Sequence, residues 1–419
     1  MQHLIYPSSG KDTLEDLSSK LSFDAFSKLR VSQPFGLLES KFLYDKNDNI
    51  WEDVTDTSGV VTYLSNESAI KLEVGSGSND YCLRQTYKYF PYIAGNSQRI
   101  FLSGNLEGKE TGRVKRIGYF DNSNGLFFEL ASDDLYVVVR SSTSGSVIDT
   151  GVKRTSFNID RLDGTGPSGI TFDPTMRQIF MISFQWLGVG SVTFGFSFNG
   201  KIYPVHQVHN ANTGLTTYMA MPNLPARFEI RNNGIATGTG VMKQVCTSIA
   251  SEGGYQIPGY DFNANNNIIG KSISTTRVPI MAIRLKNSFN SKANRRIANL
   301  QNINGFVTGG NVMIDTMWLG GITATTATWT DVDDTSGMEY STDISAYTST
   351  HAHKINTSYL AAGNGQVGGA LDATFTALNY NTAISQNYAS NQSQMIVVYG
   401  QSLAGTVNLH ISINWTEFE

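Results

Sequence analysis

Charge and cysteine are both scarce in this sequence. Only 16% of the 419 residues are Asp, Glu, Lys or Arg, whereas about 25% is usual for a globular protein. The net charge is −4, and Lys and Arg occur at most as pairs such as Lys115 with Arg116, which argues against nucleic-acid binding as the main task. The two cysteines, Cys82 and Cys246, cannot form a disulfide framework, and we expect two reduced, buried thiols.

Long apolar runs are absent as well. No stretch reaches the roughly 20 apolar residues that a membrane span requires. The N-terminus, MQHLIYPSSGK, has no charged segment followed by an apolar one, which a secretory signal would need. We therefore expect no membrane partner, and we expect the protein to be made in a cytoplasm.

Short alternating segments separated by Gly- and Asn-rich turns make up most of the chain. The clearest is residues 177–198, in which Val192, Phe194 and Phe196 alternate with small or polar residues after a Gly-rich turn. This period of two predicts a hairpin with one face on a core. The same pattern predicts strands at residues 60–64, 69–74, 81–90, 99–106, 115–120, 125–130 and 135–141, and later at 279–285, 310–319, 338–342, 395–399 and 407–415. The predicted fold class is all-β, with two β-sandwich domains of jelly-roll or lectin-like type.

Changes in composition divide the chain. Residues 1–36 are predicted to be an extended arm with one short helix, because Leu14, Leu17 and Leu21 recur at helical spacing. Residues 37–262 form the first predicted sandwich and residues 279–419 the second. The Asn-rich segment 263–278 between them is predicted to be a linker.

Candidate sites are few. His351 and His353 lie two residues apart, which places both rings on one face of a strand and makes them a weak candidate for metal binding. Glu129 and Glu229 are isolated acids, so a mechanism with two carboxylates has little support, and we predict no enzyme and no cofactor. Aromatic rings often stack on sugars. The rings flanking the central strands form a possible glycan surface: Tyr119, Trp186, Tyr203 and Tyr218.

The segment FDAFSKLRVSQPFGLLESK, residues 23–41, resembles an N-terminal motif of structural proteins of tailed bacteriophages, of the form FDAFGRLRVS followed by Pro and a short SK element. Ser27 and Lys28 replace the Gly and Arg of that motif. Later stretches resemble further blocks of the same family in the same order: RIGYFDNSNGLFFEL, RLDGTGPSGITFD, IFMISFQWLGVGSVTFGF, LPARFEIRN and the terminal NWTE.

This resemblance implies a non-enzymatic structural protein of the virion, assembled in the host bacterial cytoplasm on a capsid, neck or tail partner. The exposed apolar residues of the arm are the predicted docking residues, together with one arginine: Phe23, Phe26, Leu29, Arg30 and Phe35. We expect a homo-oligomer, with a trimer as the first hypothesis. The alternative is a lectin-like tail appendage that recognises glycans on the host surface.

Overall fold

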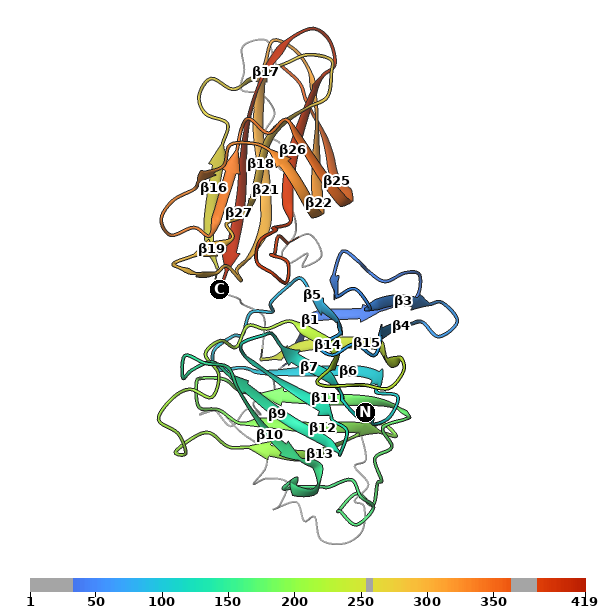
Figure 1. Cartoon of the computed structure of the whole chain (residues 1–419). Coiled ribbons are helices and arrows are strands. Elements are labelled where there is room, and N and C mark those ends of the chain that lie inside the picture. The colour runs from blue at the N-terminus through green and yellow to red at the C-terminus, as the bar shows by residue number, and fades with distance from the viewer. Residues whose placement is uncertain (1–32, 254–258, 363–382) are drawn as a thin grey trace, which may run out of the picture.

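The chain is built almost entirely from antiparallel β-strands, which confirms the predicted fold class. The computed structural model describes residues 33–253, 259–362 and 383–419. Apart from one short 3-10 helix, Arg154–Ser156, the regular elements of these residues are strands, and they gather into two sandwiches (Figure 1). No helix in the described ranges is long and apolar enough to cross a membrane.

The first sandwich pairs an eight-stranded sheet with a seven-stranded sheet. The eight-stranded sheet has the order β13 (Lys201–Val208), β12 (Val192–Phe198), β11 (Arg177–Phe184), β6 (Ser97–Asn105), β15 (Gly240–Glu252), β4 (Ala69–Val74) and β3 (Val60–Leu64), with β1 (Pro34–Lys41) also pairing β15. The seven-stranded sheet has the order β10 (Ile148–Lys153), β9 (Leu135–Ser141), β8 (Gly125–Leu130), β7 (Arg113–Phe120), β14 (Ala226–Asn232), β5 (Tyr81–Thr86) and β2 (Trp51–Thr55).

Aromatic side chains fill the space between these two sheets. The hairpin predicted at residues 177–198 is confirmed as β11 and β12, in which Phe180 lies opposite Phe196. Phe128 of the facing sheet packs against both rings at centroid distances of 5.1 Å, and against Phe194 at 5.4 Å. On the other face of β12, a Cβ added at Gly195 would lie 2.8 Å from the carbonyl oxygen of Tyr203, so the neighbouring backbone approaches too closely for a larger residue.

The second sandwich pairs a four-stranded sheet with a six-stranded sheet. The four-stranded sheet is centred on β27 (Val407–Phe418), which pairs β16 (Tyr260–Asn265), β17 (Lys271–Ile273) and β21 (Ile297–Thr308). The six-stranded sheet has the order β23 (Thr330–Asp331), β24 (Met338–Ser341), β18 (Val278–Leu285), β26 (Met395–Ser402), β22 (Val312–Thr326) and β25 (Ala346–Leu360). A two-stranded hairpin of β19 (Ser288–Phe289) and β20 (Lys292–Ala293) completes it.

The predicted linker at residues 263–278 is wrong. This range contains the end of β16 and all of β17, and both strands pair with β27. Asn263 and Asn265 alternate with the half-buried Phe262 and the buried Ala264, so the amides lie on the exposed face of a regular strand. Amide-rich composition therefore marked a polar sheet face and not a flexible connection. The last strand of the first sandwich ends earlier, at Glu252.

The two sandwiches contact each other through the segment that contains Tyr388. Its backbone N–H donates to Glu52 Oε2 at 2.6 Å, and its hydroxyl accepts a hydrogen bond from Asn122 Nδ2 at 2.7 Å. The guanidinium of Arg227 lies 5.5 Å from the centre of the Tyr388 ring. Burial raises the pKa of Glu52 to about 7, although the Tyr388 hydrogen bond and the charge of Arg295 oppose this.

Candidate functional site

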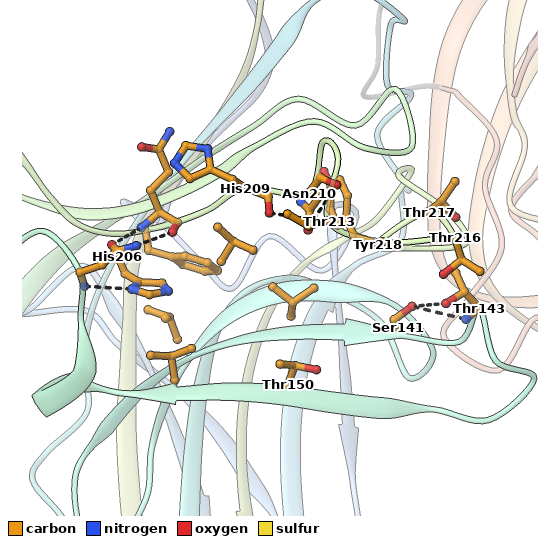
Figure 2. Close-up of a pocket in the computed structure, with 18 residues that line it drawn as sticks. Ser141, Thr143, Thr150, His206, His209, Asn210, Thr213, Thr216, Thr217 and Tyr218 are labelled. Carbon is orange, nitrogen blue, oxygen red and sulfur yellow. Dashed lines mark hydrogen bonds between the residues drawn. The ribbon is translucent and has the colours of Figure 1, made fainter.

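A cavity of about 620 Å³ lies at the edge of the first sandwich, where β9 and β10 of one sheet face β12 and β13 of the other (Figure 2). The segment that follows β13, as far as Tyr218, closes one side of it. Apolar side chains that point between the sheets line its inner part: Val137, Val139, Val152, Phe194 and Val208. The alternation of each strand explains this lining, because every second residue faces the sandwich interior.

Hydroxyl and amide groups line most of the rest of the cavity, together with His206, His209 and Gly214. The hydroxyl and amide groups come from Ser141, Thr143, Thr150, Asn158, Gln207, Asn210, Thr213, Thr216, Thr217 and Tyr218. Several are held in place: Asn210 Nδ2 donates to the carbonyl of Gly190 at 2.6 Å, and the Tyr218 hydroxyl donates to the carbonyl of Gln185 at 2.9 Å. Among the described residues that line the cavity there is no Asp, Glu, Lys or Arg.

His206 is the buried titratable group of this cavity. Its Nδ1 accepts a hydrogen bond from the backbone N–H of Asn158 at 3.2 Å, and its ring packs near Phe157. An accepting Nδ1 carries no proton, which leaves Nε2 as the protonated nitrogen. Burial lowers the pKa of His206, so the imidazole is neutral at pH 7. The cavity as a whole therefore suits an uncharged ligand that carries hydroxyl groups.

The two isolated acids of the sequence, Glu129 and Glu229, come together on the outer face of the seven-stranded sheet. Arg116 bridges them, with its Nε 2.7 Å from Glu129 Oε2 and its Nη1 3.0 Å from Glu229 Oε1. Glu229 also pairs with Arg227, and with Arg231 at 3.3 Å. Burial alone would raise the pKa of Glu229, but the surrounding guanidinium groups outweigh it and lower the pKa to about 2.

Guanidinium groups also cover the aromatic rings of this face. Arg140 lies 5.1 Å from the centre of the Phe127 ring, and Arg116 lies 5.6 Å from the same ring. Arg227 lies 5.0 Å from the centre of the Phe120 ring. Both phenyl rings are fully buried, so the arginines and the rings form a closely packed layer here. The alternation Arg227, Glu229, Arg231 along one strand was the visible signal for this cluster.

The four aromatic residues predicted to form a glycan surface do not share one face. Tyr119 is a correction: it is fully buried in the core, and its hydroxyl donates to the carbonyl of Phe90 at 3.0 Å. Trp186 is half-buried and donates its indole N–H to the carbonyl of Met219 at 3.0 Å. Tyr203 is half-buried beside Phe198. Of these four residues, only Tyr218 lines the cavity. In the sequence His206 stands out only as half of a short pair with His209. The hydroxyl rim could not be predicted, because sheet pairing and not sequence spacing assembles it.

The two histidines considered as a weak metal-binding candidate lie on β25, a strand that was not predicted, with His353 opposite Trp318 and His351 opposite Gly320. His353 stacks on the indole of Trp318 at a centroid distance of 5.6 Å, and His351 Nδ1 is 2.8 Å from Thr350 Oγ1. No group of three His, Cys, Asp or Glu side chains that could hold a metal occurs in residues 33–253, 259–362 and 383–419.

Of the predicted docking residues, Phe23, Phe26, Leu29 and Arg30 lie outside the described residues. The predicted short helix of the arm does so too. Phe35 falls within β1, where it is half-buried against the core of the first sandwich.

Cys82 is buried as predicted, but Cys246 is exposed, because it lies on the outward face of β15.

No family model matches this chain, and no curated protein matches it either. Solved structures share its architecture at low identity. A protein of unknown function from Shewanella oneidensis MR-1 is 9% identical over 59% of this chain and 97% of its own, with a TM-score of 0.36. The β-glucanase of Bacillus licheniformis is 11% identical over 54% and 99%, with a TM-score of 0.32. A legume lectin-like domain from Entamoeba histolytica is 10% identical over 53% and 97%, with a TM-score of 0.29. The likeness concerns the sandwich fold alone.

Proposed function

We propose that this chain is a non-enzymatic structural protein of a tailed-bacteriophage particle. The observation that carries the proposal is the ordered series of sequence stretches that resemble structural proteins of such phages. Four of these stretches supply paired strands of the two sandwiches: β7 with β8, β11 with β12, β14 and the end of β27. A resemblance carried by core strands supports a common fold more strongly than one carried only by a surface loop.

The chemistry of the two acids supports a non-enzymatic role. Glycosidases that use two carboxylates need one of them protonated at the working pH, with a raised pKa. Glu229 has the opposite environment, since its neighbouring arginines lower its pKa to about 2. Glu129 forms an ion pair with Arg116, which also pairs with Glu229. Guanidinium groups cover the Phe127 ring beside these acids. Glu229 is therefore placed to hold the sheet together, and it is in the wrong state to donate a proton.

The arm provides the test of assembly. Phage carrying a deletion of residues 1–32, which leaves β1 intact, should produce particles that lack this chain, as measured by mass spectrometry of gradient-purified particles. The control is the substitution Ser144→Trp, which lies in the exposed turn between β9 and β10 and should be incorporated normally. Incorporation of the truncated chain at the wild-type level would refute docking through the arm, and absence of the wild-type chain from particles would refute the proposal itself.

Recognition of a neutral glycan by the first sandwich is the second candidate, and the uncharged, hydroxyl-lined cavity is the observation that favours it. Thr150→Trp should fill the cavity and abolish binding of the full chain on an array of host surface glycans, whereas Ser144→Trp should bind like the wild type. Equal binding by both variants would show that the cavity is not the glycan site.

A further inference from the structure

The outer face of the four-stranded sheet carries an ordered ladder of polar side chains. Cross-strand pairing aligns Asn263, Asn414 and Asn302 in one row, and Asn265, Ser412 and Asn304 in the next. A third row consists of Phe306 opposite His410. Successive rows are two residues apart, which corresponds to about 7 Å along a strand. Three consecutive rows of one exposed sheet face thus combine amides, a hydroxyl and an aromatic pair.

Two hollows follow these rows. One, of about 570 Å³, is lined by Asp261, Phe262, Asn263, Gln301, Asn302, Asn414, Trp415 and Thr416. The other, of about 550 Å³, is lined by Asn265, Asn266, Asn267, Ile268, Asn304, Gly305, Phe306, His410, Ile411 and Ser412. Because the rows that line them are neighbours on β16, β21 and β27, the two hollows lie next to each other along one sheet face, and together they are called the groove below. Asp261 is the only Asp, Glu, Lys or Arg among these described lining residues.

An exposed aromatic platform lies at one end of the groove. The Phe306 ring stacks on the His410 imidazole at a centroid distance of 4.2 Å and an interplanar angle of 4°. The backbone of Gly270 also lies against the imidazole, since a Cβ at this position would be 2.7 Å from its Nε2. The imidazole is therefore fixed by its neighbours, and Phe306 remains 45% exposed. A supported ring that stays open to solvent offers a flat apolar surface at little cost in side-chain entropy.

The amides next to this platform are oriented by each other. Asn302 Oδ1 accepts from Asn414 Nδ2 at 2.5 Å and from Asn304 Nδ2 at 3.2 Å. At the far end, Gln301 Nε2 donates to Thr416 Oγ1 at 2.9 Å, and that hydroxyl donates to Asp261 Oδ1 at 2.5 Å. An Asn side chain can form up to four hydrogen bonds, so these contacts use only part of the capacity of each amide.

We propose that this groove binds a linear, uncharged polysaccharide. One sugar ring would lie against Phe306 through its C–H face, and the hydroxyls of the following sugars would exchange hydrogen bonds with the two amide rows. The near absence of charge favours a neutral chain over a polyanion. Sugar hydroxyls can replace the water on these amides, whereas an apolar protein surface would leave the amides unpaired. The proposal goes beyond the virion role and does not depend on the cavity of the first sandwich.

Affinity electrophoresis of the full chain tests the groove. Native gels containing soluble neutral β-glucan, mannan or dextran should retard the wild type in at least one case, and dextran sulfate should not. Phe306→Ala should weaken the apparent Kd roughly tenfold or more, which is the loss expected if about 1.4 kcal/mol of stacking is removed. Asn302→Ala should weaken it as well. Tyr359→Ala is the matched control, because it removes an exposed aromatic ring from β25 of the other sheet and should leave the Kd unchanged.

Other outcomes would overturn the proposal. Failure of every neutral polysaccharide to retard the wild type would do so, as would equal retardation of the wild type and Phe306→Ala. Sedimentation that shows self-association of the wild type but not of Phe306→Ala would reassign the groove to contact between copies. Thr150→Trp in the cavity of the first sandwich should leave retardation by the groove intact, so the two glycan proposals can fail separately.

Discussion

Replacing Glu229 by Gln is expected to destabilise the first sandwich severely. The carboxylate is buried and lies among Arg116, Arg227 and Arg231, at 3.0 Å from the first and 3.3 Å from the third. A neutral amide would remove the charge with which Arg227 and Arg231 pair, and it would leave Arg116 with Glu129 alone. Removing one partner of a buried ion pair typically costs about 3–5 kcal/mol. We therefore expect a loss of about this size in the free energy of unfolding.

Glu129→Gln is the matched control for this prediction. Glu129 is partly exposed and pairs with Arg116 alone, which keeps Glu229 as its other partner. Because Glu129 keeps some contact with solvent and Arg116 retains Glu229, this variant should lose less stability than Glu229→Gln. Hydrogen exchange of peptides from β7 and β14 in increasing urea gives the free energy for the first sandwich separately from the second.

The comparison of these two variants also bears on catalysis. If the acids served a hydrolase, both substitutions would leave a stable fold and remove an activity. Our account requires that only Glu229→Gln unfolds easily. A difference of less than about 0.5 kcal/mol between the two variants would refute the reasoning, because it would show that the arginine cluster does not depend on the buried charge.

Three further predictions concern other parts of the chain. Burial raises the pKa of Glu52 from 4.5 to about 7, so folding favours its protonated form. The contact between the sandwiches should therefore be stabilised by roughly 1–3 kcal/mol as the pH falls from about 8 to about 5. Thermal melts at the two pH values should show this dependence for the wild type and not for Glu52→Gln. Ser40→Ala should lower the free energy of unfolding by about 1–3 kcal/mol in urea titrations, because it leaves the buried indole N–H of Trp51, now 2.8 Å from the Ser40 hydroxyl, without an acceptor. A maleimide should label Cys246 in the native protein and Cys82 only after unfolding, because Cys82 is buried and its pKa is raised to about 12. Labelling of Cys82 in the native protein, detected by mass spectrometry, would contradict its burial.

Local apolar patterning and turn residues were sufficient to predict the bounds of several strands. Residues 60–64, 69–74, 125–130 and 135–141 form β3, β4, β8 and β9 with the predicted bounds, because apolar content and flanking turns are properties of each segment alone. The prediction of a linker at residues 263–278 was wrong because it also relied on local composition alone. The exposed strand β16 carries amides on one face, and its inward residues are too few to stand out from a loop.

The candidate sites depend on strand pairing, which the sequence does not display. Glu129 and Glu229 are 100 positions apart, yet β7 lies between β8 and β14, so Arg116 reaches both. The cavity forms where the edges of two sheets meet, and its residues come from several strands and a loop. The sequence could not distinguish Tyr119, which lies in the core, from Tyr218, which lines the cavity. The residue type is the same in both cases, and only the strand pairing shows which face of a sheet each side chain occupies.

Cryo-electron microscopy of purified phage particles is the most direct test of the central claim. Our account predicts that both sandwiches can be fitted into density as a stoichiometric component of the particle, with residues 23–35 in contact with a capsid, neck or tail protein. Particles that are complete without this chain would contradict the account.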